Sequence, residues 1–433
     1  MPASLFEAAR AGLSGRDWKR FVARFWFISA PLYSHTDWGG FLKTAQSLQA
    51  QGHDILWISE APLERAFAQS NFPFRAIRKT GWLWPPPPPP DLSQIAPQDA
   101  VALRYRRALD TWLSEELVAD AVEALLDLED EIGAPDAIVS DPFLSASALV
   151  AELLNVPLII CGWPAQATLD ERSLFPVQRD LSSDSQQRIQ RLCNRFGIEG
   201  KNFSKGAAPS IISEWLHIVY FTPEWHQSEL STILPQTRFV GGIAEAPTDS
   251  APDWLLDVPL DKPLGLVTLG TSFNGDLGFY SWAAQAVAGA GMIPLVTIGW
   301  NPVTAEQKAE LKRALPRGTR LLNWAPYDHV LPRCRIAIHH GGIGTTHAAV
   351  IHGVPQIVVP HAADQRIQGR RAAEAKVGLH LTAHDVRQGQ LREGVRAIME
   401  ADWVQENARR LAREMAALGG AERAGELVAG VVG

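Results

Sequence analysis

Residues 335–378, RIAIHHGGIGTTHAAVIHGVPQIVVPHAADQRIQGRRAAEAKVG, begin with an apolar run and a glycine-rich turn. The run at 336–338 is typical of a buried parallel strand. His340 and three glycines follow it, and a helical pattern comes next until a Gly-Val-Pro sequence ends it. Residues 356–360 are apolar again and predict a second strand. The stretch therefore predicts a strand–loop–helix–strand unit of a doubly wound α/β domain.

The turn between the first strand and the helix has the composition of an anion site. Glycines let the backbone come close to a ligand, and the free N–H groups of a new helix favour negative charge. His340 adds an imidazole there, and Thr345 and Thr346 add hydroxyl groups. This composition suits a diphosphate, although a glycine-rich turn alone can also serve only packing.

Two neighbouring features favour a nucleotide-sugar site over a packing turn. Asp364 and Gln365 follow the second strand and offer hydrogen-bonding groups to sugar hydroxyls. Trp324 precedes the unit in an Asn-Trp-Ala-Pro sequence and offers a flat ring near the same sheet edge. A phosphate cradle, an aromatic platform and a hydroxyl-binding pair are the three parts that such a site needs.

Residues 324–378 resemble the signature block of the UDP-dependent glycosyltransferases of the GT-B group, family 1. The HHGG-x-GTT and DQ variants are similar to those of its bacterial and sterol-glucosyltransferase-like members, and the chain as a whole resembles the bacterial, sterol-, carotenoid- and macrolide-glucosyltransferase-like branch. The resemblance implies that Trp324 stacks on the uracil and that the backbone of Ala325 bonds its edge. It implies diphosphate contacts from the turn, namely His340, Gly342, Gly344, Thr345 and Thr346. It further implies that Asp364 and Gln365 bind the sugar hydroxyls.

A second element matches the family, while two positions depart from it. Residues 263–274 are similar to the family's strand-G-T/S element, which implies that Thr271 and Ser272 approach the phosphates from the other side of the cleft. Plant members have a Glu for the ribose hydroxyls where this chain has Ala348. Many relatives have a Gln where this chain has Tyr327. The ribose contact is therefore unassigned.

The first half of the chain opens with a predicted strand, loop, helix and strand that resemble the N-terminal half of the same enzymes, where the loop carries the general base. The usual G-H-x-x-P is absent. His35 lies at the right distance after the strand, in a PLYSH context similar to carotenoid glucosyltransferases. Counting back from the Gly-His at 52–53 instead puts Asp37 in the base position. An imidazole of ordinary pKa or a buried carboxylate can accept a proton, so both assignments stay open.

Asp141 ends another predicted buried strand. The resemblance places it where plant relatives have the Asp that orients the catalytic His, which implies a dyad with His35. Each residue also has a purely structural alternative. Asp141 can cap the helix predicted after it, and His35 can bond a loop carbonyl.

The acceptor side is less clearly marked. A Gly-Trp-Leu-Trp sequence at 81–84 precedes six prolines, which predict an exposed polyproline II segment. In the family this region often borders the acceptor pocket, so Trp82 and Trp84 are candidate contacts for an apolar acceptor. The alternative is a spacer or a partner-binding strip. Residues 168–213 are polar and predict a helical insertion over the acceptor side.

Composition excludes several classes of protein. The chain has 433 residues, 46% hydrophobic and 20% charged, and a formal net charge of −7, which argues against a nucleic-acid binder. Three widely spaced cysteines fit a reducing compartment rather than a disulfide framework or a zinc site. The sequence has no signal-peptide core and no uninterrupted membrane span, so we expect a cytoplasmic protein. Peripheral membrane contact and the oligomeric state are left open.

The expected architecture is GT-B, with two doubly wound Rossmann-like α/β domains facing a cleft. Residues 1–242 are expected to bind the acceptor, 243–262 to form a linker rich in Pro, Asp and Ala, and 263–433 to bind the nucleotide sugar. In relatives the last part of the chain crosses back to the first domain.

The expected function is inverting transfer of a hexose from a UDP-sugar to a hydroxyl of an apolar alcohol or phenol. The terminal Gln365 favours glucose, while dTDP-sugars remain open. No D-x-D carboxylate pair lies beside the phosphate loop, so no metal or other cofactor is expected. A sugar-nucleotide epimerase or an N-acetylglucosaminyltransferase of the same fold is disfavoured by the Trp-Ala-Pro and Asp-Gln spacing. A degenerate member that only binds nucleotide or activates a partner enzyme is the non-catalytic alternative.

Overall fold

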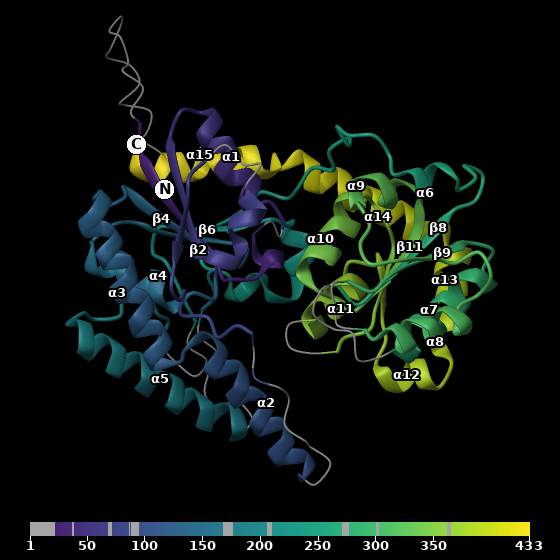
Figure 1. Cartoon of the computed structure of the whole chain (residues 1–433), viewed down its shortest axis with the longest axis horizontal. Coiled ribbons are helices and arrows are strands. Elements are labelled where there is room, and N and C mark those ends of the chain that lie inside the picture. Colours follow the sequence, from purple (N-terminus) through teal and green to yellow (C-terminus); the bar gives the residue numbers. More distant parts are fainter. Residues whose placement is uncertain are drawn as a thin grey trace, which may run out of the picture.

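The computed structural model describes residues 22–36, 39–67, 72–85, 87, 95–167, 176–205, 210–270, 277–299, 303–361 and 365–433. These residues form two α/β domains that lie side by side, as Figure 1 shows. Each domain is built on one sheet of parallel strands. The two sheets confirm the predicted doubly wound architecture.

The first domain contains a seven-stranded sheet in the order β3-β2-β1-β4-β5-β6-β7. Its strands are β1 (Arg24–Ile28), β2 (Asp54–Glu60), β3 (Phe74–Ile77), β4 (Ala137–Ser140), β5 (Leu158–Cys161), β6 (Leu216–Val219) and β7 (Thr237–Phe239). Its helices are α1 (Phe41–Ala50), α2 (Pro97–Trp112), α3 (Glu115–Ile132), α4 (Ser145–Leu153) and α5 (Pro176–Phe196). Short 3-10 segments are η1 (Tyr33–His35), η2 (Ala61–Phe67) and η4 (Pro223–Thr232).

The second domain contains a six-stranded sheet in the order β10-β9-β8-β11-β12-β13. Its strands are β8 (Leu264–Thr268), β9 (Ile293–Thr297), β10 (Arg320–Leu322), β11 (Cys334–His339), β12 (Gln356–Val358) and β13 (Gly378–His380). Its helices before the C-terminal part are α6 (Asp253–Leu256), α7 (Leu277–Gly289), α8 (Ala305–Ala314), α9 (Tyr327–Val330), α10 (Ile343–Ile351), α11 (Gln365–Glu374) and α12 (Ala383–Arg387), with η5 (Leu331–Arg333) before β11. Helices α13 (Gln390–Glu400), α14 (Asp402–Ala417) and α15 (Gly420–Val432) complete the chain.

The strand order in each sheet reverses at one point, and these two points position the site. In the first sheet β1 lies beside β4, with Ile28 opposite Ser140. In the second sheet β8 lies beside β11, with Thr268 opposite His339. At such a point the loops leaving the two neighbouring strands turn to opposite sides of the sheet, which opens a crevice at the carboxyl ends of the strands.

The strands are apolar on both faces because helices cover both sides of each sheet. In β1, Trp26 and Ile28 pack into the cluster beneath α3 and α4. Phe25 and Phe27 point to the opposite face and pack with residues of α1. This alternation explains why the strand has no polar position between residues 25 and 28.

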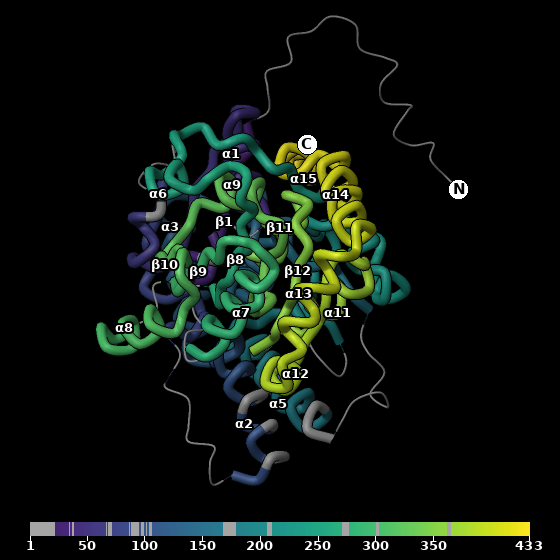
Figure 2. Tube along the Cα trace, turned by 90° about the vertical axis from the view of Figure 1, so that its right-hand side faces the viewer, coloured from purple at the N-terminus to yellow at the C-terminus, as the bar shows by residue number. Residues whose placement is uncertain are grey.

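The C-terminal helices connect the two domains. Figure 1 shows α14 over the second domain and α15 continuing to the first, beside α1; Figure 2 shows the same pair from the side. The backbone N–H of Gly420 donates to the carbonyl of Val240 at 2.7 Å. Ala424 and Val428 are fully buried in the same cluster as Phe27. The core of the first domain thus includes residues from the end of the sequence.

The segment between the domains is partly structured. It contains α6, and Leu255 and Val258 are buried with Leu264 and Val330 in a cluster of the second domain. Residues 256 and 260 are exposed on the same segment. The apolar positions fix this segment to the second domain.

Gly241 and Gly291 provide a test of the junction, because both have positive φ, +64° and +80°. A Cβ at Gly241 would lie 2.0 Å from the carbonyl oxygen of Met415 on α14, whereas nothing lies within 4 Å of one at Gly291. We expect Gly291→Ala to lower the free energy of unfolding by about 1–2 kcal/mol through backbone strain alone. Gly241→Ala should lower it by a further ~1–3 kcal/mol, because backbone must move. Urea unfolding measures both, and equal losses would contradict the close packing of the junction.

Candidate active site

A cavity of about 1350 Å³ lies between the two domains. Residues that follow β1, β4 and β5 line it from the first domain, and residues that follow β8, β9 and β11 line it from the second. Its position therefore follows from the two points of strand reversal. This volume exceeds the roughly 300–1,000 Å³ of pockets that hold one drug-sized ligand, so the cavity has room for two reactants.

His35 and Asp141 form a hydrogen-bonded pair in the wall of the first domain. Nδ1 of His35 lies 2.7 Å from Oδ2 of Asp141, and Asp141 is fully buried. The other carboxylate oxygen, Oδ1, accepts from the backbone N–H of Phe143 at 3.0 Å. Because the carboxylate of Asp141 accepts a hydrogen bond from the Nδ1–H of His35, the neutral ring is held in the tautomer that carries its lone pair on Nε2. His35 lines the cavity, so a general base of the Asp–His type can operate there.

Aromatic rings surround His35. Its ring centroid lies 5.7 Å from that of Trp82 and 5.7 Å from that of Phe143. Phe143 in turn lies 5.6 Å from Trp82 and 5.9 Å from Trp163. Trp84, the second aromatic candidate from the sequence, lines the same cavity. This wall offers large apolar surfaces to a ligand beside the base.

The opposite wall carries the groups expected for a nucleotide. Trp324 lines the cavity with 58% of its surface exposed, while Ala325 beside it is buried. Gly342 caps α10, and Gly344 and Thr345 lie in its first turn on the cavity wall. The N–H groups of this turn have no partners within the helix and present a partial positive charge.

His340 sits tightly between two glycines at this turn. A Cβ at Gly270 would lie 2.6 Å from Cε1 of His340, and one at Gly342 would lie 2.5 Å from Nε2. Burial, with the nearby charges of His339 and His361, lowers the pKa of His340 to about 3. The imidazole is therefore neutral at pH 7. A neutral ring can still donate one N–H to a phosphate oxygen.

The two threonines of the turn have different roles. Thr345 lies on the cavity wall, and its hydroxyl lies 3.2 Å from that of Tyr327. Thr346 is fully buried, and its hydroxyl donates to the carbonyl of Gly342 at 2.9 Å. That bond uses the hydroxyl inside the helix, which argues against the expected contact of Thr346 with a diphosphate.

Gln365 begins α11 and lines the cavity with only 3% of its surface exposed. Its Oε1 accepts from the backbone N–H of His361 at 2.9 Å. Four other candidates lie outside the described residues, namely Asp37, Thr271, Ser272 and Asp364. The structure therefore does not test Asp37 as the alternative general base to His35.

Several wall residues were not singled out from the sequence, namely Trp112, Phe143, Trp163, Thr268, Gly270 and Gly299. Their shared signal is position. Phe143 and Trp163 come two or three residues after the ends of β4 and β5, where ligands of doubly wound sheets bind. Trp112 ends α2, and no local pattern marks it.

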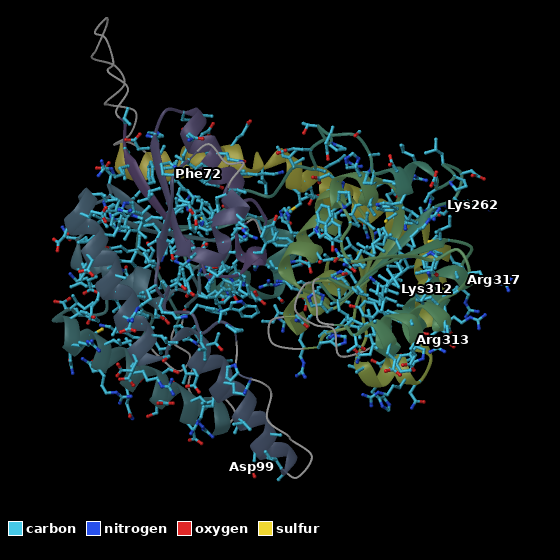
Figure 3. The ribbon with its side chains drawn as sticks, viewed as in Figure 1. Phe72, Asp99, Lys262, Lys312, Arg313 and Arg317 are labelled. Atoms are coloured by element: carbon cyan, nitrogen blue, oxygen red, sulfur yellow. The ribbon has the colours of Figure 1, made fainter. Side chains whose placement is uncertain are left out.

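Basic residues also lie outside the cavity. Figure 3 labels Lys262, Lys312, Arg313 and Arg317, which lie at the outer end of the second domain, far from the first. None of these four lines the cavity. Among the described residues, no helix is apolar over the length that a membrane crossing requires.

Residues 301–429 match the family "Erythromycin biosynthesis protein CIII-like, C-terminal domain". The NDP-glycosyltransferase YjiC of Bacillus subtilis (strain 168) is 27% identical over 295 residues, which cover 67% of this chain and 71% of that protein. The erythronolide mycarosyltransferase of Saccharopolyspora erythraea is 26% identical over 329 residues, 72% of each.

Solved structures agree on the fold. The glycosyltransferase of kitacinnamycin superposes with a TM-score of 0.72 at 20% identity, covering 95% of this chain and 99% of that one. The spinosyn rhamnosyltransferase SpnG, solved with thymidine diphosphate, superposes with a TM-score of 0.67 at 19% identity, covering 92% and 98%. These similarities support a family 1 glycosyltransferase with the GT-B fold. The fold and the family predicted from residues 324–378 are confirmed.

Within the nucleotide site, the two positions at which this glycosyltransferase departs from the family pattern both lie on the cavity wall. Ala348 presents only a methyl group there. Tyr327 is held by Thr345, and burial raises the pKa of its hydroxyl, which therefore stays protonated. Neither side chain replaces a carboxylate as the acceptor for two ribose hydroxyls.

Buried imidazoles give this glycosyltransferase a testable response to acid. Burial lowers the pKa of His217, His339 and His347 to about 4 each, and that of His340 to about 3. In the unfolded chain these groups titrate near pH 6.5. Between pH 6.5 and about 4 the unfolded chain therefore binds protons that the folded chain does not, and stability falls as the pH is lowered.

We expect each imidazole to contribute up to about 1.4 kcal/mol per pH unit to this fall. Urea unfolding at pH 7, 6 and 5 measures the slope of the unfolding free energy against pH. His217→Gln removes one titrating group and should reduce this slope by up to about 1.4 kcal/mol per pH unit. A free energy of unfolding that stays constant from pH 7 to pH 5 would contradict the neutral state of these imidazoles.

Proposed function

We propose that this glycosyltransferase moves a hexose, glucose in the first instance, from a UDP-sugar to a hydroxyl of an apolar small molecule, with inversion at the anomeric carbon. One observation carries the proposal: an Asp–His pair and the N-terminus of α10 lie on opposite walls of one cavity. The first can accept a proton, and the second can stabilise a leaving diphosphate.

In the proposed step, Nε2 of His35 takes the proton of the acceptor hydroxyl while its oxygen forms the new bond to the anomeric carbon. The bond from that carbon to the diphosphate oxygen breaks at the same time. Asp141 holds the ring and stabilises the imidazolium that forms. A single displacement of this kind inverts the configuration.

The leaving diphosphate gains its negative charge beside the first turn of α10. The backbone N–H groups of Gly344 and Thr345 and the N–H of neutral His340 are the donors that we assign to it. These groups are already oriented before the reaction, so little reorganisation is needed as charge develops. No metal ion or other cofactor takes part in the proposed step.

The acceptor is proposed to be an apolar alcohol or phenol. Trp82, Phe143 and Trp163 form the wall next to His35, and rings of this size bind apolar surfaces through burial and stacking. A hydroxyl group on such a molecule would be held at the base while its rings contact the wall. Trp84 is assigned to the same wall.

The choice between UDP and dTDP depends on the ribose. Ala348 offers no acceptor to a 2′-hydroxyl, and the related rhamnosyltransferase was solved with thymidine diphosphate. The donor test therefore includes both nucleotides. We assign Trp324 to stack on the nucleobase, and Gln365 and Asp364 to bind the hydroxyl groups of the transferred sugar.

The donor site can be tested by thermal unfolding with UDP, dTDP and UDP-glucose. A nucleotide at a hundredfold excess over its dissociation constant should stabilise the protein by about 2.7 kcal/mol. Trp324→Ala should weaken binding about 5- to 150-fold, since stacking of a base on an aromatic ring contributes about 1–3 kcal/mol. Trp324 is exposed, so the variant should fold. His340→Ala should also weaken binding.

If dTDP stabilises the protein and UDP does not, the donor is a dTDP-sugar and not a UDP-sugar. No stabilisation by either nucleotide would overturn the proposed donor site. Trp403→Ala is a matched control, because Trp403 is similarly exposed on α14 and does not line the cavity.

The catalytic assignment predicts that His35→Ala lowers kcat about 10²- to 10⁴-fold, the usual contribution of a general base. Asp141→Asn should lower kcat in the same direction, because it removes the charge that stabilises the imidazolium. Initial rates with a panel of phenolic acceptors and NMR of the product's anomeric centre are the measurements. If both variants bind the nucleotide as tightly as the wild-type chain, the loss of kcat reflects the chemical step and not binding of the donor.

Asp37→Asn serves as the comparison. If it lowers kcat and His35→Ala does not, the base is Asp37. A product with retained configuration would overturn the single displacement.

A further inference from the structure

Segment η4 of the first domain packs against helix α11 of the second. The two are far apart in sequence, and α11 is the helix whose first residue, Gln365, lines the cavity. The site described above uses no residue of η4.

Two kinds of polar contact join η4 to α11. The indole N–H of Trp225 donates to Oε1 of Gln368 at 3.0 Å, and both side chains are buried. The carboxylate of Glu229 accepts from Arg371, and its other oxygen accepts from Arg370 at 2.8 Å. Each contact fixes α11 against the first domain.

The pair of Glu229 and Arg371 is buried and charged. Only 3% of the Arg371 side chain is exposed, against 16% for Glu229. Burial acts to raise the pKa of Glu229, but the imidazole of His226, whose Nδ1 lies 3.5 Å from Oε2, and the charge of Arg371 outweigh it and lower that pKa to about 2. The carboxylate is therefore ionised at pH 7, and a buried guanidinium without it would be strongly unfavourable.

The contacts continue around α11 from the cavity residue, so that Arg371, six residues on, lies about 120° around the axis from Gln365. Gln365, Gln368 and Arg371 are spaced three residues apart, which brings them to neighbouring positions on the helix surface. With a rise of about 1.5 Å per residue, Arg371 is about 9 Å along the axis from Gln365. A helix of this length moves as a unit, so a shift at Arg371 displaces Gln365.

We infer that Glu229 is a positioning residue for the donor sugar: through Arg371 it sets where α11 begins and hence where Gln365 meets the sugar hydroxyls. This inference rests on the proposed function, which assigns Gln365 to the sugar. It couples the domain that binds the acceptor to the recognition of the donor. The nucleotide is assigned to α10 and Trp324, so the inference concerns the sugar and not the nucleotide.

The same segment supplies a matched control. Glu224 of η4 also forms an ion pair with the second domain, accepting from Arg410 at 2.6 and 2.7 Å. Arg410 lies on α14, which is described throughout and has no residue on the cavity wall. Glu224→Gln therefore removes a more exposed bridge between the same segment and the second domain, with 31% of the Glu224 side chain exposed, without changing a contact of α11.

The experiment compares Glu229→Gln and Glu224→Gln with the wild-type chain. We expect Glu229→Gln to raise KM for the nucleotide sugar about three- to tenfold, as for loss of one hydrogen bond to the sugar. The dissociation constant for the nucleoside diphosphate, measured by calorimetry, should stay within about twofold of the wild-type value. The ratio of kcat/KM for two donors that are epimers at C4 should move toward one. Glu224→Gln should change none of these.

Trp225→Phe is a second variant in case Glu229→Gln does not fold, since it removes only the N–H that bonds Gln368. It should shift the C4-epimer ratio in the same direction. An epimer ratio and KM in Glu229→Gln equal to those of Glu224→Gln would overturn the inference, because the pair would then serve stability alone. The inference would also be overturned if Glu229→Gln weakened binding of the nucleoside diphosphate as much as it raised KM for the nucleotide sugar. A wild-type chain that binds no nucleoside diphosphate would instead overturn the proposed function.

Discussion

The constraint on which the structure depends is the reversal of strand order in a parallel sheet. Parallel strands need crossover helices, and the loops on either side of a reversal leave toward opposite faces. In this chain the reversal lies between β1 and β4 in one domain and between β8 and β11 in the other. His35 and Asp141 meet because they follow neighbouring strands, although 106 residues separate them. His340 and Gly270 meet for the same reason in the second domain.

The two reversals can face each other only because the domains are held together elsewhere. An apolar cluster contains Phe221 and Trp225 from the first domain with Val350, Ala372 and Met415 from the second. Phe221 stacks on Trp225 at 5.1 Å between ring centroids, and the edge-on ring of His347 lies 5.3 Å from Phe221. Burial of this surface favours association of the domains, and the ion pairs at its border help to fix their orientation. The shape of the cavity thus depends on residues such as Trp225 and Met415, which do not line it.

Local sequence predicted those parts of the fold that depend on local patterns. The strand, glycine-rich turn and helix of residues 335–378 appear as β11 and α10, because apolar runs and helix stops are short-range signals. The predicted strand at 356–360 ends earlier, at Val358. Pro360 has no N–H to donate to the sheet, which is consistent with the shorter strand.

Parts that depend on distant contacts could not be predicted in this way. Nothing near Trp225 indicates that it bonds Gln368, which is 143 residues away. Thr346 and Thr345 are adjacent hydroxyl residues, and only the helix geometry shows that one faces the carbonyl of Gly342 while the other faces the cavity. The aromatic wall around His35 is assembled from loops after three different strands and from the end of α2, so no single segment of sequence marks it.

The docking of α15 on the first domain has a consequence for synthesis of the chain. Ala424 and Val428 complete a core whose other members end at residue 240. At about 5–20 residues per second, a ribosome needs about 10–40 s to proceed from one to the other. During that interval the surface of α1 that α15 will cover is exposed, and chaperones can bind it. The first domain made is therefore not the first to be finished, and the second can fold while the first still waits for its last helix.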